Sequence, residues 1–89
     1  MTQLEIIHLR SSGESIEALI DRIKESIGKR GDRISYSLYR SHGLDTDLAV
    51  HILRSDVAVE QGPSDLALRL AAEFRAYGLV EHTVWEERG

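Results

Sequence analysis

Residues 33–55 read RISYSLYRSHGLDTDLAVHILRS, and this stretch decides the fold. From residue 34 to residue 41, apolar and polar side chains alternate, as in a β-strand that buries one face. The segment 48–55 is apolar on both faces, which is typical of a strand inside a sheet that is covered on both sides. Residues 42–47, HGLDTD, contain the Gly and Asp that turns favour. The stretch therefore predicts a β-hairpin.

One helix and one further strand flank the hairpin on each side. Residues 4–11 predict a first strand with apolar side chains on both faces, and residues 79–87 predict an alternating last strand. Residues from about 12 to 27 have apolar side chains at helical spacing. A second helical pattern begins at Pro63, which a first helical turn tolerates, and ends at Gly78, a residue typical of helix C-termini.

The order strand–helix–strand–strand–helix–strand predicts one α+β domain over residues 1–89. Right-handed crossovers interleave two βαβ units into a four-stranded antiparallel sheet of order 4-1-3-2, with both helices on one face. This ferredoxin-like arrangement puts the first and third strands in the centre, and these are the strands that are apolar on both faces. The other sheet face has no helix over it. Because exposed apolar sheet faces mark interaction surfaces, we expect a homodimer that packs sheet against sheet.

Composition excludes several functional classes. The net charge of −4 argues against nucleic-acid binding, and the central strands lack the aromatic residues on which RNA-recognition modules of this strand order stack bases. No apolar run reaches the roughly 18 residues of a membrane span, and no signal-peptide pattern is present. The absence of Cys excludes disulfides and thiolate metal sites and fits a cytoplasmic protein. Neither a G-x-S-x-G motif nor a phosphate-binding glycine loop occurs.

The last predicted strand contains HTVWEE at 82–87 and follows a helix that ends in AYGLV at 76–80. Together with the order of elements and the length, this resembles the dimeric α/β-barrel group, which includes small cofactor-independent monooxygenases of the antibiotic-biosynthesis type and stress-response proteins. The resemblance covers the whole chain as topology. It implies a homodimer without a cofactor and a cavity in which enzymes of the group place His, Trp, Asn or Tyr. The match here is one of residue types.

Three histidines are the candidate catalytic residues: His8, His51 and His82. They lie near the middle of the first, third and last strands, which the predicted order makes neighbours. If Leu4 pairs with Ser55 and with Glu87, the three histidines lie at a similar level along the strands. Three histidines on one face could hold Zn²⁺. Alternation, however, groups His82 with core-like valines and places His51 on the other face of its strand, so packed or hydrogen-bonded histidines are favoured and no metal is expected.

Three other side chains are candidates for ligand binding. Arg54 lies at one end of the hairpin, on the face of Val50 and Ile52, and could cap a cavity that holds an acidic ligand. Tyr36 and Trp85 could each line a ligand cavity, or each could pack in the core or at the dimer interface. Trp85 is the best candidate for an interface residue. At the other end of the sheet, we expect Arg10 and Arg40 to form ion pairs around the turn that contains Asp45 and Asp47.

The sequence predicts a homodimer that acts as a small-molecule-binding or dimerising module. One alternative is a monooxygenase-like enzyme for an aromatic or quinol substrate, with a sheet histidine as the base and Trp85 or Tyr36 beside it. A second alternative is a ligand-sensing regulatory dimer that resembles amino-acid-binding domains of the same topology, with its ligand at the subunit interface. The expected partners are a second copy of the chain and a small organic ligand. Whether the protein is an enzyme stays open at this point.

Overall fold

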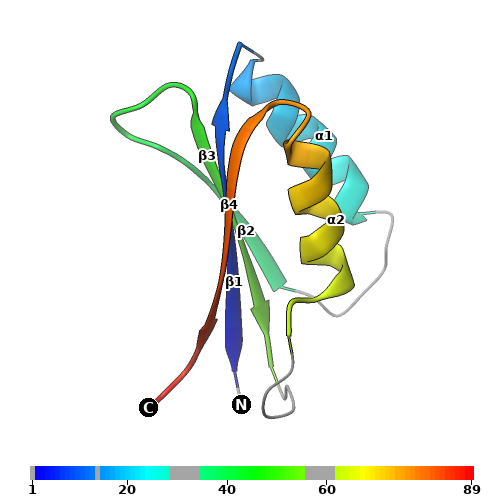
Figure 1. Ribbon diagram of the computed structural model, residues 1–89, viewed down its shortest axis with the longest axis vertical. Helices are drawn as coiled ribbons and strands as arrows, with labels where there is room; N and C mark the ends of the chain where they lie inside the picture. The colour runs from blue at the N-terminus through cyan, green and yellow to red at the C-terminus, as the bar shows by residue number, and fades with distance from the viewer. Residues whose placement is uncertain (1, 14, 29–34, 56–61) are drawn as a thin grey trace.

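The computed structural model describes residues 2–13, 15–28, 35–55 and 62–89. The elements follow in the order β1 (Gln3–Ser11), α1 (Ile16–Gly28), β2 (Ser35–Arg40), β3 (Asp47–Arg54), α2 (Asp65–Phe74) and β4 (Gly78–Glu86). The sheet has the order β2-β3-β1-β4 with every neighbouring pair antiparallel. Both helices cover the same face of it (Figure 1). The predicted ferredoxin-like fold, with the order 4-1-3-2, is confirmed. Residues 33 and 34 of the predicted hairpin lie outside the described residues.

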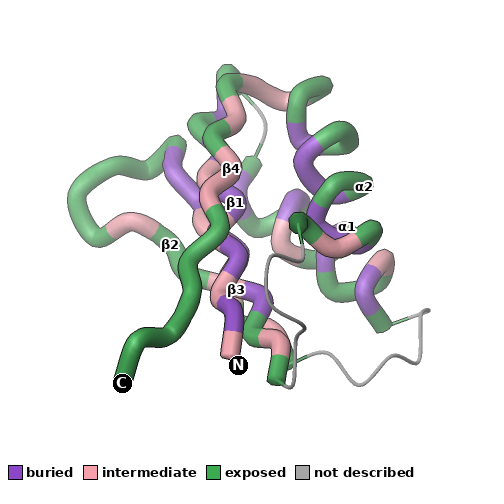
Figure 2. Tube along the Cα trace, turned by 60° about the horizontal axis from the view of Figure 1, so that its bottom comes forward, coloured by how far each residue is buried: buried purple, intermediate pink, exposed green. Residues whose placement is uncertain are grey.

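The core fills the space between the sheet and the two helices. Burial alternates along β1, and the buried sides of both helices face the sheet (Figure 2). Ile7 and Leu9 of β1 are inaccessible to solvent, and so are Val50 and Ile52 of β3. Phe74, at the end of α2, is 2% exposed. The two strands predicted to be central therefore provide the sheet side of the core. Neither described helix, of 13 and 10 residues, is long and apolar enough to cross a membrane.

The second helix differs from the sequence prediction at both ends. It begins at Asp65 rather than at Pro63, because Ser64 is the N-cap and its side chain accepts a hydrogen bond from the Ala67 amide at 3.1 Å. It ends at Phe74 rather than near Gly78. A capping hydroxyl thus determines the start of the helix more strongly than the preceding proline does.

Gly78 is the first residue of β4, and its role is steric. A Cβ atom at this position would lie 1.9 Å from the carbonyl oxygen of Arg10 in β1. Glycine is needed here because the two backbones approach each other closely as β4 enters the sheet. The prediction of a helix C-cap at this position was wrong.

A buried carboxylate connects β1 to the start of α2. The Glu5 side chain lies on the helix-covered face of the sheet and is inaccessible to solvent. It accepts hydrogen bonds from the Ser64 backbone amide at 2.7 Å and from the Ser64 hydroxyl at 2.6 Å. A negative charge at a helix N-terminus is favourable because free amides and the helix dipole both point toward it. Glu5 therefore fixes α2 against the centre of the sheet.

Candidate functional site

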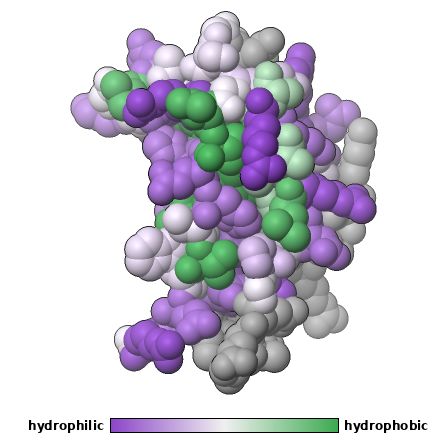
Figure 3. Space-filling model, in the orientation of Figure 1, coloured by the Kyte–Doolittle hydropathy of each residue, from purple (hydrophilic) through white to green (hydrophobic). Residues whose placement is uncertain are grey.

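The face of the sheet opposite the two described helices, here called the open face, is mixed in character. The register aligns its side chains in rows across β3, β1 and β4, because paired residues in antiparallel strands point to the same side. Four of the seven exposed large apolar side chains that the structure describes lie on this face: Tyr39, Leu53, Leu79 and Trp85. Seen from the side of β4, apolar patches alternate with hydrophilic side chains (Figure 3).

One end of the open face is apolar. Leu4 of β1 pairs with Leu53 of β3 and with Trp85 of β4, which forms a row of three large apolar residues. Leu53 is 44% exposed and Trp85 is 58% exposed. The Trp85 indole donates to the Thr83 hydroxyl at 3.0 Å, so the ring is hydrogen-bonded along its own strand, β4. This row is the most continuous apolar strip on the open face.

The other end of the open face contains a polar cluster centred on Asp47. Its side chain is only 6% exposed although it lies on the side without helices. One carboxylate oxygen lies 2.8 Å from His8 Nε2, and the other accepts from Arg10 Nε at 3.2 Å and from the Thr46 hydroxyl at 2.9 Å. These donors, with the His8 contact first among them, hold the pKa of Asp47 below its usual value, although burial alone raises it. Asp47 is therefore ionised at neutral pH.

His8 is positioned by this carboxylate. An ionised carboxylate only accepts hydrogen bonds, so His8 Nε2 bears the proton that points to Asp47. In neutral His8, the other ring nitrogen, Nδ1, is then the acceptor. The side chain is 41% exposed, so solutes can approach the ring. A histidine oriented by a buried aspartate and open on its other side is a group that can accept and return a proton.

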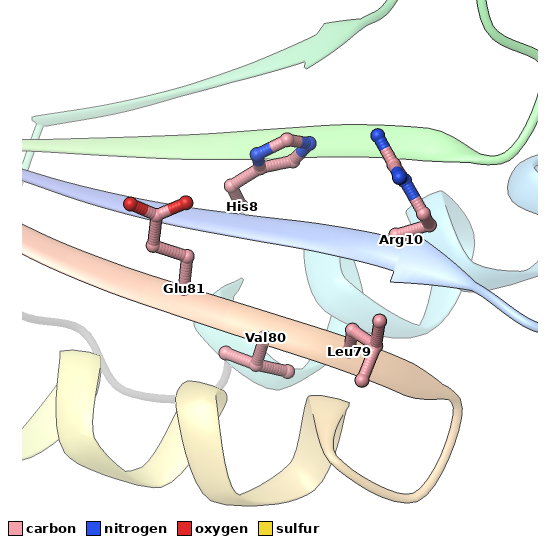
Figure 4. Close-up of a pocket in the computed structure, with 5 residues that line it drawn as sticks. All are labelled: His8, Arg10, Leu79, Val80 and Glu81. Carbon is pink, nitrogen blue, oxygen red and sulfur yellow. The ribbon is translucent and has the colours of Figure 1, made fainter.

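Two hollows of the surface meet at His8. The first has a volume of about 340 Å³ and is lined by His8, Arg10, Leu79, Val80 and Glu81, from β1 and β4 (Figure 4). The second, of about 200 Å³, lies toward β2 and β3 and includes Tyr39, Arg40 and Asp47 in its lining. His8 belongs to both hollows. The candidate site therefore consists of the polar cluster and the two hollows beside it.

The structure does not bring the three candidate histidines together. His8 and His51 lie on the open face, where the His51 ring packs against Tyr39 with 4.5 Å between the ring centroids. His82 pairs with Ile7 and lies on the helix-covered face, with Nε2 at 4.0 Å from a Glu5 oxygen. A common three-histidine metal site is thus excluded by geometry, and the described residues contain no group of three His, Asp or Glu side chains placed to hold a metal ion.

The predicted ligand-binding residues are also separated. Tyr36 is half-buried against the core on the helix-covered face. Arg54, on the same face, donates to the Gln3 side chain at 3.0 Å and to the Gly62 carbonyl at 3.3 Å. Trp85 lines a hollow of about 460 Å³ near the chain ends, on the opposite side from Tyr36 and away from His8. Tyr39, rather than Tyr36 or Trp85, lines the 200 Å³ hollow together with His8.

Sequence reasoning missed two carboxylates that organise the molecule. Asp47 was expected as an ion-pair partner in the turn, and its contact with Arg10 is confirmed, but its contact with His8 was not foreseen. The feature that could have indicated the importance of Asp47 is its position at the very start of β3, opposite Arg10. For Glu5 the signal was a lone acid among the alternate residues Glu5, Ile7 and Leu9, which share a face of β1. Arg40 lies 3.9 Å from Asp45, as expected, and it also pairs at 2.8 Å with Glu17 of α1, which the sequence did not predict.

Fold and site together define a small ferredoxin-like α+β domain whose open face combines an apolar end with a polar cluster at His8, Arg10 and Asp47. Comparison of the chain with protein-family models, with curated proteins and with solved structures finds no match.

Proposed function

We propose that the chain is a single-domain homodimeric module that binds a small organic molecule at the open face of its sheet. The observation that supports this proposal is the exposure of Tyr39, Leu53, Leu79 and Trp85 on the face that the helices leave uncovered. Apolar side chains gathered on one sheet face are stabilised when a second surface removes them from water. The second copy would also cover the hollows at His8 and turn them into enclosed binding space. The absence of Cys fits a cytoplasmic location.

The open face has an apolar row at one end and a polar cluster at the other, and this difference favours one symmetry axis for the dimer. A two-fold axis parallel to the strands places each row against the same row of the partner, so that the apolar row of Leu4, Leu53 and Trp85 packs on its own copy. An axis in the sheet plane but perpendicular to the strands would instead place this row over Asp47 and Arg10. Covering a charged pair with apolar side chains is unfavourable because desolvation is not compensated. We therefore propose the axis along the strands.

The dimer can be tested with matched substitutions of leucine. Leu53 is 44% exposed on the open face, and Leu68 is 51% exposed on α2, on the other side of the molecule. We expect light scattering to give a dimer mass for the wild-type protein and for Leu68→Glu, and a monomer mass for Leu53→Glu. A wild-type protein that is monomeric at its highest soluble concentration contradicts the proposal, as does a Leu53→Glu variant that stays dimeric.

A second candidate function follows from the contact between His8 and Asp47. The buried carboxylate orients the ring, and Nδ1 is left to accept a proton from a weakly acidic hydroxyl group. This supports the monooxygenase-like alternative, with Tyr39 instead of Trp85 or Tyr36 beside the base. Oxygen consumption in the presence of a quinol provides the test. We expect His8→Gln to abolish any uptake that the wild-type protein catalyses and His51→Gln to retain it; equal activity of the two variants would exclude His8 as the base.

A further inference from the structure

We infer that the hollow between β1 and β4 binds a small zwitterion, with the carboxylate of the ligand at Arg10 and its ammonium group at Glu81. This inference rests on the proposed small-molecule-binding function and names its ligand class. The hollow is lined by both a cationic and an anionic side chain, separated by His8. In Figure 4, the Glu81 carboxylate and the Arg10 guanidinium lie on opposite sides of the His8 ring.

Arg10 is suited to bind a carboxylate in a fixed position. Two of its nitrogens, Nε and Nη2, contact Asp47 at 3.2 and 3.5 Å, which restricts the orientation of the guanidinium plane. The side chain is nevertheless 57% exposed. A guanidinium group has five N–H donors in a rigid fork, so a group that is pinned from one side can still present donors on the other. Little side-chain entropy is lost when such a pre-oriented group binds an anion.

Glu81 sets the sign of charge at the other end of the hollow. It pairs with His8 across β1 and β4, and it is exposed on the open face. A simple anion at Arg10 would meet repulsion from Glu81 as well as from Asp47. A simple cation at Glu81 would leave the donors that Arg10 presents to the hollow without an acceptor. A molecule that contains both charges is attracted at both ends. Arg10 and Glu81 are diagonal neighbours on adjacent strands, and their charged groups lie on either side of the His8 ring (Figure 4), so a ligand with an ammonium and a carboxylate would lie across this ring.

The remaining lining restricts the size and polarity of the ligand. Leu79 is 75% exposed and provides an apolar wall next to Arg10. The volume of about 340 Å³ is near the lower end of the range for small-molecule sites, roughly 300–1,000 Å³. Both properties fit an amino acid with a short apolar side chain. A polar side chain would place its polar group against Leu79, which offers it no hydrogen-bond partner.

Three probes with a shared carbon skeleton separate the possible charge classes: leucine, 4-methylpentanoate, which lacks the amine, and 3-methylbutylamine, which lacks the carboxylate. Binding to the full chain can be followed by the NMR signals of the His8 ring, with His82 on the opposite face as an internal reference. We expect leucine to bind at least tenfold more tightly than either of the other probes. The Glu81→Gln variant is expected to remove the advantage of leucine over 4-methylpentanoate, and Arg10→Met to remove the advantage over 3-methylbutylamine.

Matched controls are Glu87→Gln and Arg69→Met, which change exposed charges outside the hollow and are expected to leave the preference for leucine intact. Glu81→Gln keeps the contacts of Asp47, so the test stands even if Arg10→Met fails to fold. Equal affinity of the wild-type protein for leucine and 4-methylpentanoate would overturn the inference in favour of a plain anion site. Absence of any His8 shift with all three probes would overturn it as well. Light scattering on the same samples decides the dimer separately.

Discussion

Asp47 is a charged side chain with almost no exposure on a sheet face that no helix covers. Its ionised form is stabilised by the donors of His8, Arg10 and Thr46, so its pKa lies below the ordinary value of 3.8. In the unfolded chain these donors are dispersed. The unfolded state therefore binds more protons than the folded state as the pH falls through this range. The stability that Asp47 contributes is complete above pH 3.8 and is lost as the pH falls through the lower, folded-state pKa.

The Asp47→Asn variant tests this linkage. We expect it to be less stable than the wild-type protein at pH 7, because His8 and Arg10 lose a charged acceptor. The difference should shrink as the pH falls from 3.8 through the lower pKa of the folded state, at which Asp47 of the folded wild-type protein becomes neutral. Urea unfolding of both proteins across this pH range provides the measurement. Asp45→Asn, at a position whose side chain is 98% exposed, is the control. A difference that does not change with pH would contradict the role of the charge.

For individual residues, the sequence predicted the sheet face of each side chain more successfully than the side chains that it contacts. Alternation places His8 and Arg10 on one face of β1, and the structure agrees. The registers assumed for Leu4 are shifted by two residues, since it pairs with Leu53 instead of Ser55 and with Trp85 instead of Glu87. A shift by an even number keeps every side chain on its face. Contacts between side chains, such as His8 with Asp47, depend on the register itself and therefore could not be derived.

At the scale of elements, Gly78 controls how β4 joins the sheet. The Gly78→Ala variant would place a methyl group against the carbonyl of Arg10, and a rigid backbone cannot yield as a flexible side chain can. We expect a loss of at least about 1–3 kcal/mol in the free energy of unfolding, the usual range for overpacking. In a domain of this size, this corresponds to a decrease of roughly 4–8 °C in Tm per kcal/mol.

Thermal unfolding followed by circular dichroism measures this effect. Gly43→Ala is the matched control, because a Cβ atom at Gly43 has nothing within 4 Å and its backbone is not in the left-handed region. Its Tm should differ little from that of the wild-type protein. If both variants unfold at the same temperature, the close approach of Gly78 to β1 is not a constraint on the fold.

The element boundaries show which local signals were informative. The hydrophobic pattern located both helices, whose buried residues repeat at helical spacing. Their ends depend on single hydrogen bonds instead. Ser15 accepts from the Ala18 amide at 3.4 Å at the start of α1, and Ser64 caps α2. Neighbouring serines and a proline offer several capping possibilities in this sequence, and only the tertiary position of the segment, for α2 the contact with Glu5, selects among them.

At the scale of the whole molecule, the strand order was predictable because two independent patterns agree: the order of elements and the two-sided apolar character of β1 and β3. The homodimer is a weaker inference from the same pattern, since an apolar sheet face indicates that a surface is covered but does not by itself identify what covers it. The fold and the open face thus follow from periodicity, whereas the polar cluster and its hollows follow from register and side-chain geometry.

Dimer formation predicts a thermal stability that depends on concentration. Because association favours the folded state, the Tm of the wild-type protein should rise when the protein concentration is increased. The Leu53→Glu variant should show no such dependence. Scanning calorimetry over a broad concentration range provides the measurement. A wild-type Tm that does not change with concentration would mean that unfolding does not include dissociation, in conflict with the proposed dimer.

The central position of β1 also has a consequence for the kinetics of folding. Gln3 at its start pairs with Arg54 on one side and with Glu86 on the other, so both ladders of β1 join segments that are distant in the chain. Closing such long loops has an entropic cost before the contacts form, and domains rich in non-local pairing fold slowly compared with helical domains of equal stability. We expect the arrival of β3 and β4 at β1 to limit the rate of folding, which stopped-flow folding and unfolding kinetics of the variants can measure. Substitutions on β1 will slow folding, whereas those on the outer surface of α1 will mainly change the rate of unfolding.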